Sequence, residues 1–131
     1  MIGLDTNILV RFLTQDDSVQ SPHAAQMIER RLTPETPGFV SLVTIAELVW
    51  VLQSIYEFTT QEIADAMERM LQIDSLVIQN QREVFLATDV LRNGTGEFDD
   101  ALIGALGRWA GCSHTFTFDR KAARLKEFRL A

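Results

Sequence analysis

The sequence predicts an α/β fold, a three-layer α/β/α sandwich around a mostly parallel central sheet. Short apolar runs alternate along the chain with longer segments whose apolar residues recur at helical spacing. Each connection between successive strands is long enough to hold a helix, and such crossovers make neighbouring strands parallel, with helices on both faces. A chain of 131 residues has the length of one domain, so residues 1–131 are expected to form a single domain.

The predicted elements follow from local signals. Ser21 and Pro22 predict a helix start, with Ser21 as N-cap and Pro22 at the first helical position. Thr59 and Glu62 predict a capping box. The expected strands are 2–4, 38–41, 76–78 and 114–118. The expected helices are 8–13, 22–32, 43–55, 59–71, 81–93 closed by Gly94, 99–110 closed by Gly111, and a final helix from Asp119 to Leu125.

Charge and cysteine content exclude several classes of protein. Twelve Lys and Arg face eighteen Asp and Glu, a net charge of -6, which argues against coating nucleic acid or an anionic membrane by bulk charge. The single cysteine, Cys112, excludes an intramolecular disulfide and is expected to be a buried thiol in a reducing compartment. No signal peptide or transmembrane span is evident, so a cytoplasmic location is expected.

Acidic residues stand where strands end and helices begin. Ligands of a parallel sheet bind outside the carboxyl ends of its strands. Asp5 ends the first predicted strand, Asp119 ends the last, and Asp99 and Asp100 open a helix. Each of them alone is equally well explained as a helix cap.

Glu47 is the only charged residue between Glu35 and Glu57, and it lies in an apolar helix. Burial of an unpaired carboxylate there costs several kcal/mol unless a proton, a cation or a metal neutralises it. The alternative is a narrow solvent-facing stripe shared with Gln53 and Ser54.

Four carboxylates from separate segments, with no His or Cys in comparable positions, predict a site for hard cations. The residues are Asp5, Glu47, Asp100 and Asp119. If they converge, oxygen ligands favour one or two Mg²⁺ or Mn²⁺ ions over Zn²⁺. Such a cluster suits phosphodiester cleavage. Assigning these four acids to a site leaves a balance of only -2 for the rest of the chain.

Four motifs together resemble the PIN-domain ribonucleases, in particular the VapC-type toxins of bacterial toxin–antitoxin pairs. They are Gly3-Leu-Asp5-Thr6-Asn7, Ile45-Ala-Glu47-Leu, Phe98-Asp-Asp100-Ala-Leu-Ile103 and Thr117-Phe-Asp119-Arg. The resemblance covers nearly the whole chain. It implies Mg²⁺-dependent endonucleolytic cleavage of RNA, with metal-activated water attacking phosphorus and leaving a 5′-phosphate.

The resemblance also assigns roles to residues. Asp5, Glu47 and Asp100 match the family's metal-binding acids, and Asp119 matches a fourth, less uniform one. Thr6 and Asn7 match residues that orient the first acid, and Thr117 matches a hydroxyl beside the fourth. The sequence departs from the family pattern at Glu97-Phe98-Asp99-Asp100, where Glu97 replaces the usual Asp and Asp99 is an extra acid. Asp100 is taken as the third ligand, with Asp99 as a substitute and Glu97 as an outer-shell partner.

Expected partners follow from basic and apolar residues. Arg11 and Arg120, closest in sequence to site acids, are candidate RNA contacts, whereas Trp50 and Trp109 are expected in the core or at a subunit contact. The apolar segment 43–55, with Met67, Met70 and Leu71, predicts a homodimer. The resemblance adds a cognate antitoxin protein and pairing through helices.

Three other functions remain open. A phosphoacceptor receiver domain has this length and binds Mg²⁺, but it needs an acidic pair after the first strand, where Asp5 stands alone. A haloacid-dehalogenase-like phosphatase needs a second Asp at the position of Asn7. A PIN scaffold that binds without cleaving is opposed only by the presence of all four acids.

Overall fold

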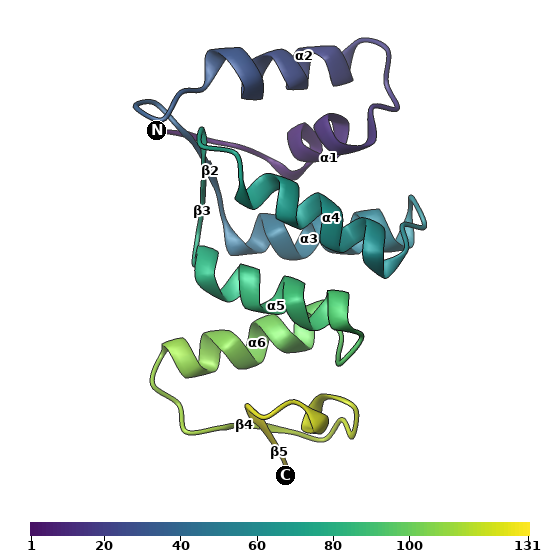
Figure 1. The fold of residues 1–131 in the computed structure, drawn as a ribbon, viewed down its shortest axis with the longest axis vertical. Coiled ribbons are helices and arrows are strands. Elements are labelled where there is room, and N and C mark those ends of the chain that lie inside the picture. The colour runs from purple at the N-terminus through teal and green to yellow at the C-terminus, as the bar shows by residue number, and fades with distance from the viewer. The chain divides into compact units, whose positions relative to one another are not determined.

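The computed structural model describes all of residues 1–131, which form two compact units, residues 1–81 and 82–131. The first unit contains a three-stranded parallel sheet in the order β1-β2-β3. Its elements are β1 (Ile2–Gly3), α1 (Thr6–Thr14), α2 (Gln20–Gln26), the π-helical turn η1 (Met27–Arg31), β2 (Gly38–Val40), α3 (Leu42–Ser54), α4 (Thr60–Leu71) and β3 (Leu76–Ile78) (Figure 1).

The central strand β2 needs a glycine where it meets the core of this unit. Gly38 pairs with Ile2 on one side and with Leu76 on the other. A Cβ at Gly38 would lie 2.7 Å from Leu32 Cδ1 and 2.9 Å from Leu4 Cδ1, so the leucines occupy the space that a side chain would fill. The largest fully buried side chains of the unit are Leu9, Phe12, Ile28, Val40, Ile45, Leu48, Leu52, Ile63, Met67 and Met70.

The second unit contains two antiparallel helices and a pair of parallel strands. Its elements are α5 (Gln81–Asn93), α6 (Phe98–Trp109), β4 (Thr115–Thr117), the 3-10 turn η2 (Ala122–Arg124) and β5 (Phe128–Leu130) (Figure 1). β4 pairs with β5, with Thr115 opposite Phe128. Gly104 of α6 lets Glu127 and Phe128 approach the helix, because a Cβ at Gly104 would lie 2.9 Å from Phe128 Cε2 and 3.0 Å from Glu127 Cβ.

The predicted α/β class with parallel strands is confirmed. All four predicted strands are present within two residues of their expected bounds. The capping box is complete, since Thr59 Oγ1 accepts the Glu62 N–H and Glu62 Oε1 accepts the Thr59 N–H. Gly94 and Gly111 have φ values of 69° and 96°, the left-handed conformation expected after a helix.

Two predicted helix boundaries are wrong. The start of α2 is not capped by Ser21: Asp17 Oδ1 accepts the N–H groups of Val19 and Gln20, so the helix begins at Gln20. Ser21 is buried and accepts the Asp17 N–H instead. The final helix from Asp119 to Leu125 is only the turn η2, because the chain then extends into β5, a strand that the sequence did not predict.

Several predicted burials are also wrong. Cys112 is exposed, and Trp50 and Trp109 are exposed in the single chain, so neither tryptophan lies in the core; the other expected place for them, a contact between subunits, stays a prediction. Conversely, Met67 and Met70 are buried within their own unit and supply no surplus apolar surface. None of the helices has the length and hydropathy needed to cross a bilayer.

Candidate active site

The first predicted site segment is the junction between β1 and α1. Asp5 is the N-cap of α1, and its Oδ1 accepts the Thr6 backbone N–H at 2.7 Å. Thr6 is buried, whereas Asp5 and Asn7 are exposed, and the Asn7 side chain forms no hydrogen bond with Asp5. The cap explains why the carboxylate stands at this strand end, and it leaves the other carboxylate oxygen free.

Glu47 is exposed on α3, so its predicted burial is wrong. The helix turns Ile45, Leu48, Val49 and Leu52 to the core, and Glu47 lies on the opposite face. The alternative of a solvent-facing stripe with Gln53 and Ser54 is the one observed. An exposed carboxylate needs no neutralising partner for stability, and it remains accessible to a cation.

The acidic group at the start of α6 brings three predicted residues together. Carboxylate oxygens of Glu97, Asp99 and Asp100 all lie within 4.8 Å of one another. Glu97 is the N-cap without a side-chain capping bond, and Asp99 Oδ1 accepts the Asp100 N–H at 2.8 Å. Asp100 is half-buried, and desolvation, followed by the charges of Asp99, Glu97 and Asp119, raises its pKa above the usual 3.8.

Asp119 follows β4 in a tight turn. Its backbone N–H donates to Thr117 Oγ1 at 3.0 Å, and its Oδ1 accepts the Lys121 N–H at 2.8 Å. Thr117 therefore contacts the residue that it was expected to accompany. The charge of Asp119 is also among the causes that raise the pKa of Asp100, after desolvation and the charges of Asp99 and Glu97.

These residues of the second unit fit a divalent cation. Glu97, Asp99, Asp100 and Asp119 form no ion pair, so no cationic side chain neutralises them. Every atom with which these four side chains could bind a metal is a carboxylate oxygen, the type of ligand that Mg²⁺ and Mn²⁺ prefer. Glu97 and Asp99, which the sequence offered as an outer partner and a substitute, lie together with Asp100.

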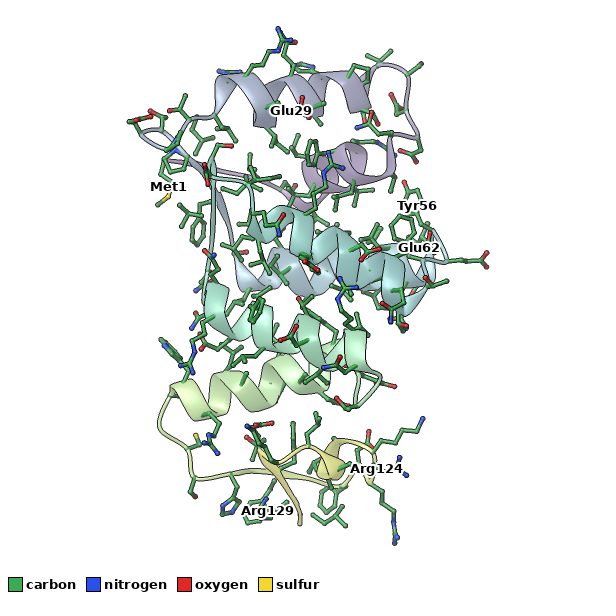
Figure 2. The ribbon with its side chains drawn as sticks, viewed as in Figure 1. Met1, Glu29, Tyr56, Glu62, Arg124 and Arg129 are labelled. Carbon is green, nitrogen blue, oxygen red and sulfur yellow. The ribbon has the colours of Figure 1, made fainter.

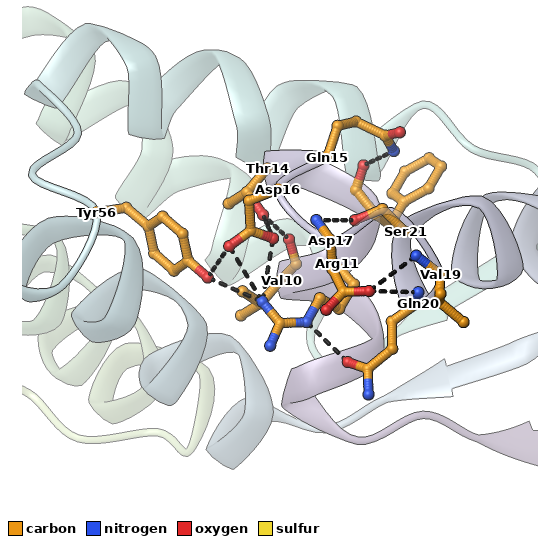
Figure 3. A network of polar contacts seen from close by, with 11 residues as sticks. Val10, Arg11, Thr14, Gln15, Asp16, Asp17, Val19, Gln20, Ser21 and Tyr56 are labelled. Carbon is orange, nitrogen blue, oxygen red and sulfur yellow. Dashed lines mark hydrogen bonds and ion pairs between the residues drawn. The ribbon is translucent and has the colours of Figure 1, made fainter.

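Arg11, a predicted RNA contact, is held in a polar network in the first unit (Figure 3). Its Nη1 donates to Asp16 at 3.0 Å and to the Tyr56 hydroxyl at 3.2 Å, and its Nε donates to Gln20 at 2.8 Å. The guanidinium thus already has partners within its own unit. Arg120 is exposed and forms no ion pair or hydrogen bond through its side chain.

Stability is expected to depend on Asp16 below pH 4. Hydrogen bonds from Tyr56, Thr14 and Arg11 lower the pKa of Asp16 from 3.8 to about 2. A lowered folded-state pKa stabilises the fold above the unfolded value, and this contribution disappears as the pH falls through about 2. Asp16→Asn is therefore expected to lower the Tm at pH 6, with the gap to the unsubstituted protein closing between pH 4 and pH 2. Circular dichroism melts across this range measure it, with exposed Asp74→Asn as control; a constant gap would contradict the assignment.

A comparison of the chain with known protein families finds a match. The family model described as the PIN domain matches residues 2–127, almost the entire chain. The chain belongs to the PIN domain family. A comparison with curated proteins finds no match.

PIN domains are generally nucleases that bind divalent metal ions. The acidic group of α6 has the carboxylate ligands that such an ion would need. A metal-dependent nuclease is accordingly the function class of the chain.

Proposed function

We propose that this PIN domain is an endoribonuclease dependent on Mg²⁺ or Mn²⁺. The observation that carries the proposal is the acidic group of Glu97, Asp99 and Asp100, which has no cationic partner. The preference for RNA is supported by the four motifs that resemble VapC-type toxins. The proposed metal ligands are Asp5, Glu47, Asp100 and Asp119, and the full chain is proposed to act as one domain.

In this proposal the side chains of the protein hold the metal ion and orient the attacking water, and no side chain acts as nucleophile. When bound, the metal activates a water for attack on phosphorus and stabilises the charge that develops on the phosphate oxygens. Asp100 and Asp119 supply negative charge, and Thr117 fixes the backbone of Asp119. Glu97 lies beside Asp100, and its side chain makes no capping hydrogen bond, so its carboxylate is available to orient a water.

The toxin role, its partners and a cytoplasmic location form the second part of the proposal. A homodimer and a cognate antitoxin protein are the proposed partners. The exposed apolar residues Val43 and Trp50 of α3, beside Glu47, support a protein contact on this helix. Arg120 remains a proposed RNA contact because its side chain has no partner in the chain. Arg11 can contact RNA only where a phosphate replaces Asp16 as the partner of its guanidinium.

Cleavage of a mixed RNA substrate tests the proposal. The purified chain is expected to cleave RNA with Mg²⁺ or Mn²⁺, to stop in EDTA, and to regain activity when metal is restored. Asp5→Asn, which keeps the size of the side chain and removes its charge, is expected to lose roughly 100-fold or more in rate. Asp74→Asn, on the surface of the same unit, is the matched control.

Cleavage in EDTA, or full activity of Asp5→Asn, would refute a metal nuclease. Absence of cleavage by a folded chain that still binds Mn²⁺ would favour the binding scaffold without catalysis.

A further inference from the structure

A cavity lies in the second unit, along α5, α6 and the segment 124–127. Its volume is about 630 Å³, enough for a nucleotide-sized group. Leu125 forms part of its wall and is held there because Gly96 leaves room: a Cβ at Gly96 would lie 3.1 Å from Leu125 Cδ2 and from Val90 Cγ1. Close packing against two glycines, Gly96 and Gly104, thus builds one side of the cavity.

Four residues that line this cavity are cationic, and their side chains have no partner. They are Arg82 of α5, Arg108 of α6, Arg124 of η2 and Lys126. Arg124 is labelled in Figure 2. None of the four side chains forms an ion pair or a hydrogen bond. Unpaired cations that line one concavity repel each other, and an anion relieves that repulsion.

The acids of the lining do not cancel this charge. Glu83, Asp89 and Glu127 also line the cavity, which leaves a balance of +1 where the chain as a whole carries -6. Glu83 is only 6% exposed, and the stem of Glu127 packs beside Gly104. The cavity is therefore a local exception in an acidic protein.

An exposed aromatic ring completes the lining. Trp109, the last residue of α6, is 66% exposed, whereas Ala101 and Ala105 on the same helix face are buried and half-buried, respectively. An exposed indole beside unpaired cations is the combination with which proteins bind single-stranded nucleic acid, because every base stacks on a ring and every phosphate attracts a cation.

We propose that this cavity binds a nucleotide segment of single-stranded RNA outside the cleavage site. Trp109 stacks on a base, and Arg108, Arg124 and Lys126 contact the flanking phosphates. The proposal rests on the proposed ribonuclease function and adds to it a binding subsite on residues that the metal chemistry does not use. It also places a balance of +1 at this site in a chain that carries -6.

Fluorescence anisotropy of a labelled ten-nucleotide RNA, in EDTA at low salt, tests the subsite without cleavage. Trp109→Ala is expected to weaken binding about 10-fold. Arg108→Gln and Lys126→Gln are each expected to weaken binding and to reduce the slope of log affinity against log salt by about 0.7. The matched controls are Phe85→Ala, an exposed ring of α5 outside the lining, and Arg30→Gln, an exposed cation of the first unit; neither is expected to change affinity.

The outcomes separate this subsite from the proposed function. If the chain cleaves RNA and the cavity variants bind and cleave like the parent protein, the subsite is wrong and the ribonuclease stands. If the folded chain neither binds nor cleaves RNA, both fail. If polyglutamate displaces the RNA and Trp109→Ala binds RNA as tightly as the parent protein, the ligand of the cavity is an acidic polypeptide and the RNA subsite is wrong. If AMP displaces the RNA at equal nucleotide concentration, the ligand is a free mononucleotide.

Discussion

Asp100→Asn is expected to lower metal-dependent RNA cleavage roughly 100-fold or more, whereas Asp99→Asn lowers it at most about 10-fold. Both residues belong to the acidic group, but their environments differ. Asp100 is half-buried, and its pKa is raised by desolvation and by the surrounding acids. Asp99 is exposed, and one of its oxygens already accepts the Asp100 N–H at 2.8 Å.

The measurement is the initial cleavage rate at saturating Mn²⁺, together with a Mn²⁺ titration of each variant. Asparagine keeps the size of the side chain and a carbonyl acceptor, so the fold is expected to be unchanged. Glu97→Gln is the third member of the set, with a loss between the other two because its carboxylate serves as outer partner. If Asp99→Asn loses activity and Asp100→Asn remains active, the third metal ligand is Asp99 and the assignment to Asp100 is wrong.

Leu48→Ala is expected to lower the free energy of unfolding by about 2–5 kcal/mol. Leu48 is 0% exposed and lies at the centre of the buried face of α3. Truncation removes apolar contacts and leaves a cavity that the surrounding side chains only partly fill. Val43→Ala on the same helix is the control, because Val43 is 79% exposed and its truncation is expected to change stability by less than about 0.5 kcal/mol.

Urea denaturation followed by circular dichroism measures both variants. Equal effects of the two substitutions would show that α3 does not bury the face assigned to it. The comparison also tests the correction at Glu47, since the exposed face that carries Val43 is the face that carries Glu47.

Local signals in the sequence were sufficient for most elements of the fold. The Thr59–Glu62 capping box was predictable because both hydrogen bonds join residues three positions apart. The turns at Gly94 and Gly111 were predictable because a left-handed residue after a helix favours glycine. The start of α2 was missed because two capping signals compete there: Asp17, four residues before Ser21, accepts the N–H groups of Val19 and Gln20.

The candidate site was predictable as a set of residue types but not as a geometry. Asp5, Asp100 and Asp119 were located from their places at strand ends and helix starts, and the structure adds the close grouping of Asp100 with Asp99 and Glu97. Glu47 was expected to be buried because α3 is apolar on most sides. The sequence of a helix with so many apolar residues does not show which of its faces is buried. The elements that pack against α3 decide that Glu47 faces solvent.

The sequence by itself determined the α/β class, the alternation of strands and helices, and the identity of the acids, because each depends on residues close together in the chain. Tertiary structure alone decided that residues 128–130 form β5 against β4 in place of a longer final helix. It also decided that Trp109 stands exposed at a cavity lined by unpaired cations. Strand pairing and the convergence of side chains join residues far apart in sequence, and no local preference encodes which distant partner they meet.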